Sequence, residues 1–72
     1  MWIVSQDRED VINTERIDLL SRDDGNIRVN IFDEWWRLAS YGNEQRAKQV
    51  FEELKIFLQK GYVRDFFYMP EE

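Results

Sequence analysis

The chain has 72 residues, of which 10 are basic and 15 acidic, so its formal net charge is −5. It contains no cysteine and no histidine, which excludes disulfides, thiolate and imidazole metal ligands, and catalytic sites built on Ser-His or Cys-His pairs. Its 43% hydrophobic content is typical of a folded protein, and the length predicts one domain over residues 1–72. With neither disulfides nor zinc to support so small a core, we expect a partner or self-association to stabilise it.

Two short strands are predicted near the N-terminus, Trp2-Ile3-Val4 and Val11-Ile12, joined by a polar loop from Ser5 to Asp10. The apolar run after Met1 is too short for a secretory signal, and no stretch approaches the roughly 18 apolar residues of a membrane span. We therefore expect a cytoplasmic protein that does not enter a membrane.

A third strand is indicated by Ile27, Val29 and Ile31, which alternate with polar residues. The hairpin before it can form in two registers. A two-residue Asp24-Gly25 turn would set Asp18 opposite Ile31, on the apolar face. A three-residue loop over 23–25, with Gly25 left-handed, sets Ile17 opposite Ile31 and Leu19 opposite Val29, and this register is preferred because a one-residue slip inverts every side chain.

The next hairpin is predicted to turn at Asp33-Glu34, so that Phe32 faces Trp35, Ile31 faces Trp36 and Val29 faces Leu38. The predicted core face of this three-stranded meander contains Ile17, Leu19, Ile27, Val29, Ile31, Trp36 and Leu38.

A helix from about Glu44 to Lys60 is the clearest element. Its apolar residues follow the i, i+3, i+4, i+7 spacing of an amphipathic helix, and they are Ala47, Val50, Phe51, Leu54, Phe57 and Leu58. Asn43 is the predicted N-cap and Gly61 the predicted left-handed C-terminal residue. Ile56 points away from the apolar stripe, toward solvent.

The segment Tyr62 to Met69 is predicted to be either an edge strand or an extended tail. The expected fold is α+β, an antiparallel β-meander of about four to five strands with the helix at about 44–60 packed on one face.

Catalytic or metal chemistry is not indicated. The carboxylates cluster in predicted turns, at Asp7 to Asp10, Asp23-Asp24 and Asp33-Glu34, where they serve local hydrogen bonding and solubility. The isolated glycines form no phosphate-binding loop, and the basic residues form no cluster for nucleic acid. We expect no enzyme activity, no cofactor, no metal and no direct nucleic-acid binding.

Aromatic residues are the most unusual feature, 11 in 72. Phe32 and Trp35 are predicted to pair on the outer sheet face, beside Arg28, Arg37 and Ala39. Three explanations remain open: the C-terminal run Phe66 to Tyr68 covers Trp35, a protein interface uses the pair, or a small ligand stacks on it.

Three short motifs carry a family resemblance. They are Val4-Ser5-Gln6-Asp7 followed by Val11-Ile12-Asn13, then Glu44-Gln45-Arg46-Ala47, and finally Phe67-Tyr68-Met69-Pro70. On these motifs the chain resembles a group of small uncharacterised proteins of Gram-positive bacteria and their phages. The resemblance implies a compact intracellular α+β domain with a prophage context and implies no catalytic residue.

The leading hypothesis is a non-enzymatic interaction module that binds protein, either a second copy as a homodimer or a host factor. The candidate interaction residues are Phe32, Trp35, Arg37 and Ile56. The alternative is a phage-type acidic inhibitor of a nucleic-acid-binding host protein, which would present its acidic loops in place of phosphate charge.

Overall fold

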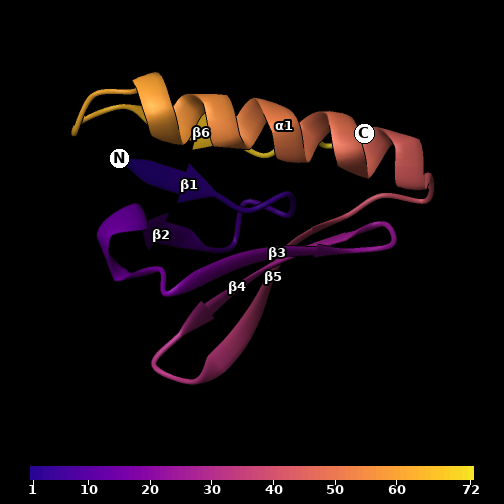
Figure 1. Cartoon of the computed structure of the whole chain (residues 1–72), viewed down its shortest axis with the longest axis horizontal. Helices are drawn as coiled ribbons and strands as arrows, with labels where there is room; N and C mark the ends of the chain where they lie inside the picture. Colours follow the sequence, from indigo (N-terminus) through magenta and orange to yellow (C-terminus); the bar gives the residue numbers. More distant parts are fainter.

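The fold combines six strands with one long helix, in a computed structural model that describes residues 1–72 (Figure 1). The elements are β1 (Trp2–Val4), β2 (Val11–Asn13), a 3₁₀ turn (Thr14–Arg16), β3 (Leu19–Asp23), β4 (Asn26–Ile31), β5 (Glu34–Ser40), α1 (Glu44–Lys60) and β6 (Phe66–Tyr68). The predicted α+β class and the helix are confirmed. The strands form two three-stranded sheets rather than one meander.

The first sheet has the strand order β2-β1-β6. β2 runs antiparallel to β1, with Ile12 opposite Ile3, and β6 runs parallel to β1, with Phe67 opposite Ile3. The C-terminal segment is therefore an edge strand, one of the two alternatives that the sequence left open. Because strand side chains alternate between faces, Ile3, Ile12 and Phe67 share the inner face.

The second sheet has the order β3-β4-β5, and its first hairpin uses a two-residue turn instead of the predicted three-residue loop. The turn is Asp24-Gly25, with Asp23 opposite Asn26 and positive φ (53°) at Asp24 rather than at Gly25. The prediction was wrong because Asp18 does not enter the core. Its carboxylate lies at the sheet rim, where Oδ2 accepts a hydrogen bond from the backbone N–H of Phe32 at 3.2 Å.

This register exchanges the faces of two neighbouring leucines. Leu20 lies opposite Val29 on the inner face, whereas Leu19 lies opposite Asn30 and is 54% exposed. The prediction that Leu19 is core is therefore wrong.

The second hairpin, β4–β5, turns at Phe32-Asp33 instead of Asp33-Glu34. Both turn residues have positive φ, 51° and 66°, the combination found in type I′ turns, whose twist matches that of the flanking strands. Glu34 then lies opposite Ile31 and Trp36 opposite Val29. Leu38 is an extra residue between the pairs Arg28–Arg37 and Ile27–Ala39, which makes β5 bulge.

The helix begins and ends at the predicted residues. Asn43 Oδ1 accepts hydrogen bonds from the backbone N–H groups of Gln45 (2.7 Å) and Arg46 (3.3 Å), which caps the first turn. Gly61 ends the helix, but with φ −73° rather than the predicted left-handed conformation. Glycine is needed here for space instead, because a Cβ at this position would lie only 2.7 Å from the carbonyl oxygen of Phe57.

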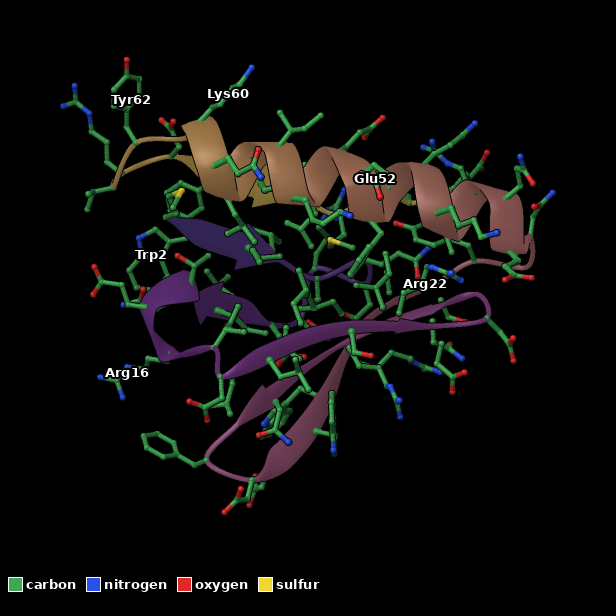
Figure 2. All side chains as sticks on the ribbon, viewed as in Figure 1. Trp2, Arg16, Arg22, Glu52, Lys60 and Tyr62 are labelled. Atoms are coloured by element: carbon green, nitrogen blue, oxygen red, sulfur yellow. The ribbon has the colours of Figure 1, made fainter.

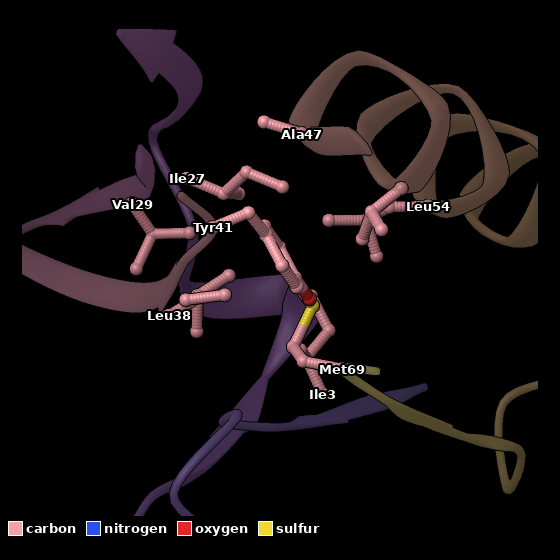
Figure 3. Close-up of a cluster of buried hydrophobic side chains, with 10 residues drawn as sticks. Ile3, Ile27, Val29, Leu38, Tyr41, Ala47, Leu54 and Met69 are labelled. Carbon is pink, nitrogen blue, oxygen red and sulfur yellow. The ribbon is translucent and has the colours of Figure 1, made fainter. Parts of the chain in front are cut away.

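The core lies between the helix and the two sheets (Figure 3). Its fully buried members come from every layer and include Ile3, Ile27, Val29, Leu38, Val50, Leu54 and Met69. Trp36 faces the same side as Val29 but is 46% exposed, so the prediction that it is core is wrong. The β4–β5 hairpin, which carries Trp36, extends away from α1, so the helix does not cover this end of the sheet (Figure 1).

Candidate functional site

The outer face of the second sheet carries exposed apolar and basic side chains together. One row across the strands contains Leu19, Asn30 and Trp35, and the next contains Ser21, Arg28 and Arg37. Leu19 is 54% and Trp35 47% exposed. We call Leu19, Arg28, Trp35 and Arg37 the Trp35 face.

Arg28 holds the centre of this face. Its guanidinium carbon lies 4.9 Å from the centroid of the Trp35 ring, a cation–π contact, and its Nη2 lies 3.9 Å from Asp23 Oδ2. Its Nε is buried without a hydrogen-bond partner. Arg37 stands directly opposite Arg28 on the neighbouring strand, and like charges in that position destabilise a sheet. The pair would therefore favour an anionic group placed between or beside the two guanidiniums.

Phe32 stands at the tip of the hairpin and is 77% exposed. It does not pair with Trp35 as predicted, because it lies in the turn and Trp35 is opposite Asn30. Ala39, predicted to lie on the outer face, is only 3% exposed, since the bulge at Leu38 turns both residues inward.

The four predicted interaction residues lie in two separate parts of the molecule. Trp35 and Arg37 share one face of β5, and Phe32 lies at the end of the same hairpin. Ile56 is 53% exposed on α1, which packs on the inner side of the second sheet. The structure therefore does not bring Ile56 to the other three.

The C-terminal aromatics leave Trp35 uncovered and build a second cluster. Phe66 stacks on Trp2 and Tyr68 on Phe66, with ring centroids 6.2 and 6.4 Å apart, and Arg8 lies 5.6 Å from the Tyr68 ring centroid. This row occupies the outer face of the first sheet, and Figure 2 shows Trp2, its first member, at the left of the molecule. This row was not predicted from the sequence. The alternation of Phe66 and Tyr68 was a signal, but nothing local indicates parallel pairing with Trp2.

Three hollows open on the surface. A groove of about 220 Å³ is lined by Asp10, Val11, Ile12, Ile31 and Trp36, and is mostly apolar. A polar hollow of about 290 Å³ lies beside Asn43 and Arg46 at the start of the helix. A third, of about 460 Å³, lies between Arg22 and the Lys48, Phe51 and Lys55 side of the helix.

The polar groups with altered acidity have structural partners. Ser5 Oγ donates to Asp7 Oδ1 at 2.6 Å, and this bond, with a second from the backbone N–H of Glu9, lowers the pKa of the Asp7 carboxyl. Burial raises the pKa of Tyr41, whose hydroxyl donates to the carbonyl of Pro70 at 2.7 Å. The acidic side chains form no group of three that could hold a metal ion.

No family model, curated protein or solved structure matches the chain at a significant level. No helix has the length and apolar character needed to cross a membrane.

Proposed function

We propose that this chain is a non-enzymatic, cytoplasmic protein-interaction module that binds its partner through the Trp35 face, with Phe32 at the edge of the contact. The single observation that carries the proposal is the exposed Trp35 ring held by Arg28, on the same sheet face as exposed Leu19. Trp and Arg are the residues in which interfaces concentrate binding energy. Ordering them in the free protein lowers the entropy lost on binding.

The strained turn supports the same proposal. Phe is disfavoured at φ 51°, where Asn or Gly is accommodated far more easily. The chain nevertheless places a large ring there, 77% exposed, where it makes no contribution to the core. Backbone strain and an exposed aromatic at one position are typical of a binding element.

The partner has a defined chemistry. It offers an apolar surface to Trp35 and Leu19, and a carboxylate to the opposed pair Arg28 and Arg37. A second copy or a host protein can supply both, and under the resemblance to phage proteins the host protein belongs to a bacterium.

Site-specific photo-crosslinking tests the proposal in the cells from which the chain comes. A benzoyl-phenylalanine replaces Phe32 or Trp35 in separate variants, and Ile56 in the control. We expect crosslinked protein adducts at 32 and 35 and none at 56, because the first two positions border the proposed contact. Adducts only at 56 would move the interface to the helix, and adducts at no position would contradict a protein-binding role.

A second candidate function has one observation in its favour. The structure adds C-terminal acids to the acidic N-terminal loop, because Arg8 bonds to Glu71 at 3.4 Å and Gln6 donates to the Glu71 carbonyl at 2.9 Å. A surface with Asp7, Glu9 and Asp10 beside Glu71 suits an inhibitor of a nucleic-acid-binding protein. Binding by this surface would weaken steeply with salt, and a partner bound equally well at about 0.05 and about 0.5 M salt would exclude it.

A further inference from the structure

The outer edge of β5 is covered in one half and open in the other. The backbone N–H of Gln6 donates to the carbonyl of Leu38 at 2.8 Å, and its side chain accepts from the N–H of Ser40 at 2.8 Å. No strand or loop pairs with β5 on that side before Leu38. The open segment therefore extends from the turn residue Asp33 to Arg37.

The register shows which backbone groups are free in this segment. The carbonyl of Asn30 accepts a hydrogen bond from the backbone N–H of Asp18, on the β3 side. Its neighbours Val29 and Ile31 therefore point their N–H and C=O groups toward β5, where they pair with Trp36 and Glu34. Because consecutive residues of a strand point their hydrogen-bonding groups to opposite sides, Trp35 and Arg37 direct theirs to the open edge. An unpaired edge of this kind is a template for another strand.

We propose that the strand is β5 of a second copy of this chain, paired antiparallel about a two-fold axis at Trp35. This inference rests on the proposed protein-binding role of Trp35 and names a partner that contacts it through the β5 edge, whereas Leu19, two strands away on β3, lies outside this contact. Trp35 is the midpoint of the open segment 33–37. A two-fold axis there joins the N–H and C=O groups of the two Trp35 residues and keeps the second copy's strand clear of Gln6.

Charge complementarity supports this register. It places Asp33 of the second copy opposite Arg37, and so supplies a carboxylate near the opposed pair Arg28 and Arg37. An axis at Arg37 would instead set two Arg37 residues against each other, and an axis at Trp36 would bring Glu34 of the second copy into the place that Gln6 occupies. The axis at Trp35 is the one that avoids both conflicts.

Sedimentation equilibrium of the full chain, from about 1 µM to about 1 mM, tests the dimer. The contact is short, so we expect a weak dimer in this range. Arg37→Glu places like charge opposite Asp33 and should raise the dissociation constant at least about tenfold. Arg16→Glu makes the same charge change on the exposed 3₁₀ turn and should leave it within about twofold. A chain that stays monomeric to about 1 mM, or equal effects of the two variants, would overturn the inference.

Disulfide trapping tests the register, since the chain has no cysteine of its own. In this register Glu34 of one copy lies opposite Trp36 of the other, and the Cα atoms of such a non-hydrogen-bonded pair are about 4.5 Å apart, within disulfide range. An equal mixture of Glu34→Cys and Trp36→Cys chains, which both keep Trp35, should therefore oxidise to a covalent heterodimer at least about tenfold faster than a mixture of Glu34→Cys and Ile56→Cys chains, because associated thiols react at a high effective concentration. Equal rates would overturn this register. A monomeric chain that still gives adducts to another protein at Phe32 and Trp35 would retain the proposed function and remove only the second copy.

Discussion

Phe32 occupies a backbone conformation, φ 51°, that its own side chain disfavours. Replacing it with Asn should stabilise the fold by roughly 1 kcal/mol, because Asn tolerates the positive φ of this turn and the Phe ring is almost fully exposed. The midpoint of urea unfolding measures the change. Phe32→Ala removes the ring but keeps most of the strain, so it should gain much less. A destabilised Phe32→Asn variant would show that the ring supports the fold and would weaken its assignment as a binding residue.

Gly25 is required by a close approach between two chain segments. A Cβ at this position would lie 2.1 Å from the carbonyl oxygen of Tyr41, whose backbone N–H donates to the carbonyl of Gly25 at 2.8 Å. Gly25→Ala should therefore destabilise the protein by roughly 3 kcal/mol, since two backbone segments would have to separate. Gly42→Ala is the matched control, because a Cβ there meets no atom within 4 Å. Comparable losses in chemical denaturation for both variants would refute the steric explanation.

Asp7 makes the stability of the fold depend on pH in acid. Hydrogen bonds from Ser5 and Glu9 lower the pKa of its carboxyl in the folded state. The carboxylate therefore contributes stability above the unfolded pKa of about 3.9, and that contribution is lost as pH falls through the lower folded value. Asp7→Asn should lose less stability than the native chain between about pH 5 and about pH 2, as followed by urea titrations at each pH. An identical acid loss in both chains would show that other carboxyls are responsible.

The N-cap residue Asn43 determines where α1 begins. Asn43→Ala leaves the first-turn N–H groups of Gln45 and Arg46 without their acceptor and should cost about 1 kcal/mol. Asn43→Asp keeps the acceptor and should retain nearly full stability. Thermal unfolding followed by circular dichroism at 222 nm measures both. An alanine variant as stable as the aspartate variant would show that packing alone positions the helix end.

The helix was predictable from sequence because its determinants are local: the apolar spacing and the cap lie within the segment itself. The hairpin registers were not, because each depends on a contact far along the chain. Asp18 is tolerated in this register because its carboxylate stays exposed at the sheet rim, where it accepts a hydrogen bond from Phe32, 14 residues away. The bulge that buries Ala39 exists only in the pairing with β4.

The candidate site was predictable in part for the same reason. Alternation along β5 placed Trp35 and Arg37 on the outer face, and their exposure follows from it. The opposed pair Arg28 and Arg37 depends on the β4–β5 register, which could not be predicted from the sequence. Parallel pairing of β6 with β1, which directs the C-terminal aromatics away from Trp35, leaves no local pattern at all.

The whole molecule depends on its last residues joining its first. β6 is hydrogen-bonded beside β1, with Met69 donating its backbone N–H to Val4 at 2.9 Å and Trp2 donating to Asp65 at 2.9 Å. Phe67 packs on Phe57 of the helix with ring centroids 5.4 Å apart, and the Met69 side chain is fully buried. The C-terminal segment is therefore part of the core, although it follows the helix as a short extension.

Deletion of residues 62–72 should abolish cooperative folding. Loss of the Met69 side chain alone would cost about 2–5 kcal/mol, which is comparable to the roughly 3–5 kcal/mol that a core of this size supplies. We expect a truncated chain ending at Gly61 to show poorly dispersed amide resonances and no sigmoidal thermal transition. A chain ending at Pro70 lacks only the exposed Glu71 and Glu72. It should unfold cooperatively, because it keeps β6, Met69 and the Pro70 residue that Tyr41 contacts. If the chain ending at Gly61 unfolded with a native-like midpoint, the first sheet would not need its parallel edge strand, and the core would be confined to β1–β5 and the helix.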